Sequence, residues 1–262
     1  MGKTRTEIDE ARDWQGALLD CAACPHHSLL EEGRCRLGHA CAYDRYARRI
    51  DRFFRWNPGL AKEFLEHPYF ETRAVAAKHV EPFFLPRLIE DPDETVRQSV
   101  AQRLPVQSRH FKALLRDPHR EVRIRVAERV EAAELAVMIH DEDYFVRQIA
   151  ARRLPPGMLV MMMHDRDPEV RKVVAARIGS EWLPAMAGDR ETRVRLVAVR
   201  RMNAAQLKQL IRDPDWQVRY EVASRLDLDD LLPMQADPDP AVHELVAQRL
   251  ASRNGDGLPK AS

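Results

Sequence analysis

A passage that begins at Asp91, DPDETVRQSVAQRLP, returns with small changes as DPHREVRIRVAERVE from Asp117 and as DPDWQVRYEVASRLD from Asp213. Six of the seven intervals between aligned units are 24 residues long, and the other is 26. This period indicates a repeat protein in which each unit buries its apolar side against its neighbours. The first positions of the units are His67, Asp91, Asp117, Asp141, Asp165, Asp189, Asp213 and Asp237.

Each unit carries the apolar pattern of one helix and one short turn. With the leading residue counted as position zero, apolar residues at the fifth, ninth, tenth and thirteenth positions fall within about 140° of one another, which predicts an amphipathic helix of roughly ten residues. The leading Asp, or the residue two places on, can cap that helix. An apolar pair upstream, such as Leu159 and Met162, has the spacing of a brief 3₁₀ or single-turn helix. We therefore expect an all-α solenoid.

Arginine occupies the sixth position of seven units. On the helical wheel this position points inward, so the guanidinium needs an acidic partner, and the Asp residues of its own or the next unit are candidates. We predict that the row bridges one unit to the next, and that Arg147→Ala lowers the melting temperature. The row contains Arg73, Arg97, Arg123, Arg147, Arg171, Arg195 and Arg219.

A second row of arginines occupies the twelfth position. This position lies at the edge of the apolar arc, where a long side chain can cover its neighbours while its head reaches water. We expect a solvated row, with a binding surface for an acidic partner as the alternative. The row contains Arg103, Arg129, Arg153, Arg177, Arg201, Arg225 and Arg249.

Three aromatic residues, Phe70, Tyr144 and Trp216, share a register three places after the first positions of their units. Packing at the helix entry is the favoured interpretation, and contact with a partner is the alternative. His140 and His164 also share a register, but other units carry Glu or Arg there. A metal site at these two histidines is therefore disfavoured.

The repeats resemble those of leucine-rich repeat variant proteins in their length of about 24 residues and in their Asp, Val-Arg, Ala and Arg-Leu pattern. The resemblance covers His67 to Leu250. It implies a right-handed superhelix in which α-helices alternate with 3₁₀ helices. We expect an N-terminal domain over residues 1–57, eight repeats over residues 58–250 and a flexible tail over residues 251–262.

All four cysteines, Cys21, Cys24, Cys35 and Cys41, lie in one segment, between helices that the pattern predicts over residues 7–20 and 42–56. A cytoplasmic protein has little use for disulfides. Zinc takes four thiolates but usually from two short knuckles, and only the first pair of cysteines forms one. An iron-sulfur cluster also takes four thiolates and tolerates wider spacing. The residues alone leave zinc and a cluster open.

The family resemblance favours the cluster. Some leucine-rich repeat variant proteins carry a small N-terminal domain that binds a [4Fe-4S] cluster through four cysteines. The resemblance implies that Cys21, Cys24, Cys35 and Cys41 are the ligands, with zinc as the alternative. His26, His27 and His39 lie between these cysteines in sequence, and we expect them near the ligands or in solvent rather than as ligands.

Composition narrows the function. Lys and Arg number 42 and Asp and Glu 41, so the chain lacks the positive surplus that drives nucleic-acid binding. No apolar run approaches the roughly 20 residues of a membrane span, so we expect a cytoplasmic protein without a membrane partner. There is no Gly-rich phosphate loop, nucleophile elbow or His-Glu-x-x-His motif, so we predict no catalytic residues, no enzyme activity and no small-molecule substrate.

The leading hypothesis is an iron-sulfur scaffold that binds another protein along the face of the solenoid. In it the cluster is a structural cap, a redox element or a sensor. Electron transfer to a redox enzyme is an alternative, and binding of nucleic acid by the arginine rows is a weaker one.

Overall fold

The computed structural model describes residues 11–255, and these fall into two compact units that divide after Glu131. Every regular element among the described residues is a helix, and the only ladder contacts there are two isolated bridges, Arg12 with Leu18 and Arg36 with Ala40. The alternation of α and 3₁₀ helices confirms the predicted all-α repeat fold.

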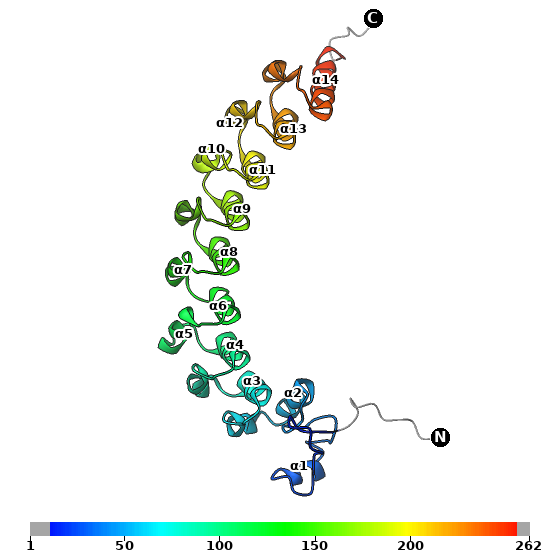
Figure 1. Cartoon of the computed structure of the whole chain (residues 1–262), viewed down its shortest axis with the longest axis vertical. Helices are drawn as coiled ribbons and strands as arrows, with labels where there is room; N and C mark the ends of the chain where they lie inside the picture. The colour runs from blue at the N-terminus through cyan, green and yellow to red at the C-terminus, as the bar shows by residue number, and fades with distance from the viewer. Residues whose placement is uncertain (1–10, 256–262) are drawn as a thin grey trace, which may run out of the picture. The chain divides into compact units, whose positions relative to one another are not determined.

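The first unit contains the cysteine segment and the first repeats. Neighbouring long helices α2, α3, α4 and α6 pack side by side, and the short helices that follow α2 in the chain lie along the other edge (Figure 1). Its elements are α1 (His27–Glu31), α2 (Ala47–Trp56), η2 (Pro58–Phe64), α3 (Phe70–His79), η3 (Pro82–Leu88), α4 (Glu94–Arg103), α5 (Arg109–Ala113), η4 (Leu114–Arg116) and α6 (Arg120–Ala127).

The second unit repeats the same arrangement, with long helices α8, α9, α11, α13 and α14 packed in sequence. The short element of a repeat is 3₁₀ in some units and α-helical or mixed in others. The elements are α7 (Ala132–Met138), α8 (Tyr144–Arg153), η5 (Pro156–Met162), α9 (Pro168–Arg177), η6 (Ser180–Trp182), α10 (Leu183–Met186), α11 (Thr192–Arg201), α12 (Ala204–Leu207), η7 (Lys208–Leu210), α13 (Trp216–Arg225), η8 (Leu228–Met234) and α14 (Pro240–Gly255).

Local sequence sets the ends of the long helices. Asp167 is the N-cap of α9, and its side chain accepts a hydrogen bond from the Glu169 amide at 2.8 Å. The same helix ends at Arg177, and the next residue, Ile178, is fully buried and has a non-helical ψ of 157°. The capping residue is thus the one two places after the leading Asp. The leading carboxylate accepts the amide of that residue, at 2.8 Å from Asp167 to Asp165, and also makes a contact with another repeat.

That contact is the predicted arginine bridge. Arg147 donates from Nε and Nη2 to Asp165 of the next repeat at 2.7 and 2.9 Å, and from Nη1 to the Asp141 carbonyl of its own repeat at 2.8 Å. The prediction is confirmed for six of the seven arginines of the sixth-position row. The same fork joins Arg73 to Asp91, Arg97 to Asp117, Arg171 to Asp189, Arg195 to Asp213 and Arg219 to Asp237.

The prediction for the twelfth-position row is wrong. Its guanidinium groups are not solvated side chains without protein partners, because they donate hydrogen bonds to backbone carbonyls at the end of the preceding long helix. Arg177, for example, donates to the carbonyls of Ala151 and Leu154 at 2.6 and 2.9 Å. A cation at a helix C-terminus also complements the helix dipole. The same contact is made by Arg103, Arg129, Arg201, Arg225 and Arg249.

The predicted helix over residues 7–20 is also wrong over its described part, residues 11–20. Asp13 accepts hydrogen bonds from the backbone amides of Gln15 and Ala17, and Gly16 has a positive φ of 91°. These features favour a tight turn over a helix. Of the predicted helix over residues 42–56, only Ala47–Trp56 is helical.

Helix α14 extends through Gly255, and the remaining residues of the predicted tail lie outside the described part of the chain. None of the described helices is long and apolar enough to cross a membrane.

Candidate metal centre

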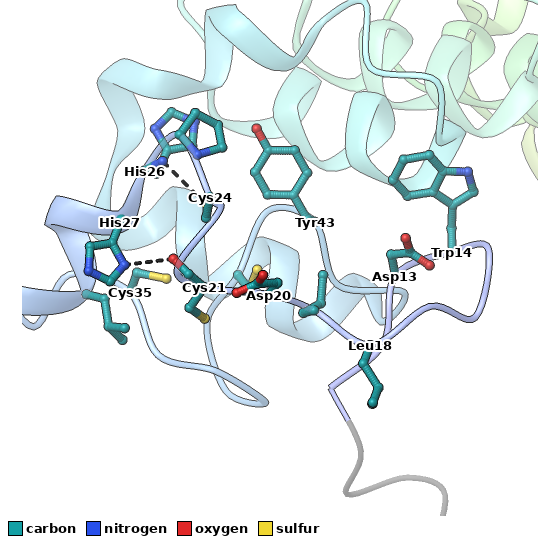
Figure 2. A pocket seen from close by; sticks show the side chains of 14 residues that line it. Asp13, Trp14, Leu18, Asp20, Cys21, Cys24, His26, His27, Cys35 and Tyr43 are labelled. Carbon is teal, nitrogen blue, oxygen red and sulfur yellow. Dashed lines mark hydrogen bonds between the residues drawn. The ribbon is translucent and has the colours of Figure 1, made fainter.

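The four cysteines line a single cavity of ≈ 250 Å³ in the first unit. Cys21 and Cys24 precede helix α1, Cys35 follows it, and Cys41 lies shortly before α2. Figure 2 shows side chains from these separate stretches gathered around the cavity. The structure therefore brings together all four of the predicted ligands.

Two glycines make this convergence possible. Gly33 and Gly38 have positive φ angles of 71° and 67°, a conformation that other residues rarely adopt. Gly33 ends α1 just before Cys35. Gly38 lies in the turn between Cys35 and Cys41, where Arg36 and Ala40 exchange two backbone hydrogen bonds of 2.9 and 2.8 Å. The two cysteines consequently flank one short hairpin.

Backbone amides donate hydrogen bonds to three of the four cysteine sulfurs. Cys24 Sγ accepts the His26 amide at 3.4 Å, and the amides of Arg36 and Tyr43 donate to the sulfurs of Cys35 and Cys41. The Cys41 thiol donates to Cys35 and lowers the pKa of the Cys35 thiol to about 7. The same hydrogen bond, together with burial, raises the pKa of Cys41. Backbone donors of this kind suit metal-bound thiolates.

The donor set fits an iron-sulfur cluster. It consists of four soft thiols in a mostly apolar cavity, with Leu18, Leu19 and Leu30 among its lining. Within the described residues, no three His, Cys, Asp or Glu side chains form a group that could hold one metal ion. A cluster does not need such a group, because its irons take their thiolates at separate corners.

The three histidines of the segment each have a contact other than a metal. His26 lies among the rings of Tyr43, Phe53 and Phe64. The His27 Nδ1 atom lies 2.7 Å from the Cys21 carbonyl oxygen (Figure 2). His39 Nδ1 accepts a hydrogen bond from Arg52 at 2.8 Å, as does the His39 carbonyl, so Arg52 fixes the turn between the last two cysteines.

Aromatic rings attach the cysteine segment to the first repeat. Trp14 packs edge-on against His67 with ring centroids 4.8 Å apart and stacks on Tyr69 at 5.9 Å. Tyr43, which lines the cavity, contacts both Phe64 and His67. His67 replaces the Asp that begins every other repeat; its ring packs against other rings, while its carbonyl accepts a hydrogen bond from Arg73 at 2.8 Å.

Polar contacts support the same junction. Asp44 is fully buried, where it accepts hydrogen bonds from Arg49 Nη1 at 2.9 Å and from the Tyr46 amide at 3.0 Å. On the repeat side, Thr72 Oγ1 donates to the Ala42 carbonyl and Tyr69 Oη to the Arg45 carbonyl. The segment that carries Cys41 is thus tied to the first repeat.

Comparisons with known proteins agree with this geometry. Residues 11–63 match a family model described as the LRV protein FeS4 cluster, and residues 144–167 match the leucine rich repeat variant model. A solved structure described as a leucine-rich repeat variant with a novel repetitive structural motif superposes with a TM-score of 0.83 at 42% identity, covering 88% of this chain and 99% of that one. The chain belongs to the leucine-rich repeat variant family. Its N-terminal segment matches the iron-sulfur cluster domain of that family.

A curated relative of this leucine-rich repeat variant protein is the uncharacterized 27.7 kDa protein in the nifB 3' region of Rhodobacter capsulatus. The two are 54% identical over 99 residues, which is 38% of this chain and 40% of the relative. The matched part is therefore less than half of the curated relative's length.

Sequence reasoning on this leucine-rich repeat variant missed the ring contacts of Trp14, Tyr43 and His67. One signal was present, because His67 is the one leading position that is not Asp. The preceding helix, α2, carries Arg49 at the register 24 residues before Arg73, and this arginine donates to Asp44 within the cysteine segment.

Proposed function

We propose that this protein is a scaffold that binds another protein, with a [4Fe-4S] cluster held by Cys21, Cys24, Cys35 and Cys41. The observation that carries the proposal is the convergence of these four thiols, from three separate stretches, on one cavity. Bound there, the cluster supplies a rigid four-point crosslink and a one-electron redox centre.

The four-thiol donor set supports the cluster type. Four thiolates complete a [4Fe-4S] cluster without a ligand from another chain. The wide Cys-x10-Cys-x5-Cys spacing departs from the paired knuckles typical of structural zinc. Zinc is the alternative occupant.

Metal analysis tests the occupant. Protein purified without oxygen is expected to contain about four iron and four sulfide per chain, with broad visible absorbance that bleaches on reduction. The Cys35→Ser variant is expected to lose most of this iron. The control variant Lys172→Ala, which lies far from the cysteines in the sequence, is expected to keep its full iron content. A colourless protein with stoichiometric zinc would contradict the cluster.

Exposed aromatic residues support the scaffold role. Phe70, Tyr144 and Trp216 begin long helices; each packs edge-to-face against a neighbouring ring and still leaves 37%, 43% and 44% of its surface exposed. Trp216 and Tyr220, one turn apart on α13, form an edge-to-face pair on the surface. Aromatic residues are enriched where proteins bind one another.

A photo-crosslinking amino acid placed at residue 220 tests this surface in extracts of the source organism. We expect one dominant crosslinked product that Trp216→Ala removes. The matched control is a crosslinker at Phe83, which is 84% exposed on η3 of the first unit. Equal labelling from both positions would contradict a specific surface.

Electron transfer is a second candidate, favoured by the access to the cavity. Cys21 and Cys24 are only partly buried, and Leu18 at the cavity rim is 68% exposed. A partner could therefore approach the sulfurs closely. Reversible reduction of the purified protein at a potential that a partner enzyme can reach would support this role.

Nucleic-acid binding receives less support. The two arginine rows bond carboxylates and carbonyls of neighbouring repeats, so their guanidinium groups are not free to contact phosphates. We expect the protein to cause no electrophoretic mobility shift of DNA or RNA, even at low salt.

A further inference from the structure

A groove lies between two consecutive repeat loops of the second unit, formed by residues 163–166 and 185–190. Its volume is ≈ 500 Å³, and it is distinct from the cysteine cavity. The corresponding grooves at residues 89–92 with 113–118 and at residues 211–214 with 233–238 measure ≈ 360 Å³ each. The groove of residues 163–190 is therefore roomier than these two.

Gly188 contributes to the larger volume. It stands immediately before the leading Asp189, at a register where each other repeat carries a side chain. Gly188 does not have a positive φ, and an added Cβ would meet nothing closer than the Ala185 carbonyl oxygen at 3.4 Å. The backbone therefore does not require glycine here. The other residues at this register are Glu66, Glu90, Arg116, His140, His164, Arg212 and Ala236.

The groove is also more positive than its two counterparts. Arg166 and Arg190 follow the leading aspartates, where the counterparts carry Pro92 and Pro118 or Pro214 and Pro238. As a result three arginines and two aspartates line it. The counterparts have two arginines against three acidic residues and two arginines against two aspartates.

Arg166 and Arg190 are available to a ligand. Asp189 in the groove is already held by Arg171, at 2.7 and 2.9 Å. Arg166 donates to the Glu142 carbonyl and Arg190 to the Arg166 carbonyl at 3.3 Å, and both side chains are exposed. Neither forms an ion pair with a carboxylate of the described residues, so their charge is not neutralised by a salt bridge.

We propose that this groove binds a carboxylate side chain from an acidic segment of a protein partner. Guanidinium groups bind carboxylates through paired N–H donors. The buried side chains of Met163 and Met186 line the same groove, and adaptable apolar side chains of this kind can cover the methylene stem of a glutamate. The proposal rests on the protein-binding function above and names the chemistry of the partner.

A labelled hexaglutamate peptide is the probe, with affinity measured by fluorescence anisotropy on the full chain. Gly188→Glu fills the groove and adds a negative charge at a register where Glu66 and Glu90 occur naturally. We expect it to weaken binding at least tenfold. Gly188→Ala is the matched control and should bind as the unchanged protein does, with thermal unfolding confirming that both variants fold.

Charge removal gives an independent measurement. Arg166→Gln combined with Arg190→Gln is expected to lose most of the affinity, whereas Arg212→Gln, in the smaller groove of residues 211–238, is expected to keep it. Equal binding of hexaglutamate by Gly188→Glu and Gly188→Ala would overturn the proposal. Displacement of the peptide by inorganic phosphate far more readily than by acetate would also overturn it, in favour of a phosphate ligand.

The failure of this proposal is distinguishable from failure of the scaffold role. Loss of peptide binding specificity would leave the crosslinking at residue 220 intact, because that surface lies on α13 and not in the groove. Absence of a crosslinked partner would leave the groove measurement valid.

Discussion

The sixth-position arginine is the residue that most directly joins one repeat to the next. One guanidinium satisfies the carbonyl of its own leading residue and the carboxylate of the following leading Asp. The side chains of Arg147 and Asp165 are only 4% and 6% exposed. Removing one member of such a pair leaves the other charge buried without its partner.

Arg147→Ala is therefore expected to destabilise the protein by about 3 kcal/mol, measured by chemical denaturation. Arg147→Lys keeps the charge but not the paired hydrogen bonds, so its free energy of unfolding should lie between those of the unchanged protein and Arg147→Ala. Lys172→Ala is the control, because its pair with Glu169 is more than 40% exposed and should contribute under about 1 kcal/mol. Equal losses from Arg147→Ala and Lys172→Ala would contradict a structural role for the fork.

His67 gives the junction with the cysteine segment a dependence on pH. Burial among the rings lowers its pKa, with a further contribution from nearby Arg73, while its Nδ1 accepts the Tyr69 amide at 3.1 Å. The native state therefore resists protonation that the unfolded chain accepts. Stability is full above the unfolded pKa of about 6.5 and falls as the pH drops below it.

We expect the melting temperature to fall between pH 7.5 and pH 5 by a larger amount in the unchanged protein than in His67→Asn. Asparagine can accept the Tyr69 amide but does not titrate. Comparing the two proteins removes the contribution of the other histidines. Parallel pH profiles would show that His67 does not titrate differently in the folded state.

At the scale of the helix, the sequence predicted which segments form helices better than it predicted where those helices begin and end. The 24-residue period and the apolar positions predicted each long helix, because burial against neighbours dictates both. The helix predicted over residues 11–20 does not form, because Asp13 and Gly16 build a turn whose local hydrogen bonds outweigh the weak helical spacing of the apolar residues. Cys21 to Cys41 were recognisable as a site from sequence, but the hairpin that joins Cys35 to Cys41 depends on Gly38.

The twelfth-position contact was missed because a helical wheel describes one helix and not its neighbour. Arg177 belongs to α9, yet its guanidinium bonds the carbonyls of α8 that have no partner within that helix. The row therefore stabilises helix ends through the next repeat, and this cannot be read from periodicity alone.

Arg177→Met tests this capping role because methionine retains much of the apolar stem. Loss of the two charged hydrogen bonds is expected to cost about 2 kcal/mol in the free energy of unfolding. Arg193→Met, at an exposed position of α11, is the control and should change stability by under about 0.5 kcal/mol. Hydrogen exchange should speed up at the last turn of α8 in Arg177→Met, and unchanged exchange there would exclude the capping contact.

At the scale of the whole chain, a stack of repeats is held by contacts between neighbours. The cysteine segment contacts the first repeat through the rings of Trp14 and Tyr43 and the carbonyls of Ala42 and Arg45, whereas later repeats depend on their own arginine bridges. Loss of metal from the cysteine cavity should therefore destabilise the cysteine segment and the first repeat but not the later repeats.

Removal of iron by a chelator under anaerobic conditions, followed by hydrogen exchange mass spectrometry, measures how far the effect extends. We expect residues 11–46 to lose protection, because Leu29, Ala40, Cys41 and Ala42 are the only buried apolar residues in that range. Helix α3 should lose some protection through Trp14 and His67, while helices α8 to α13 should keep theirs. Trp14→Ala should confine the loss to the cysteine segment, since it removes the ring contact with the first repeat. Loss of protection throughout residues 132–252 would instead show that the cysteine segment controls the folding of the entire stack.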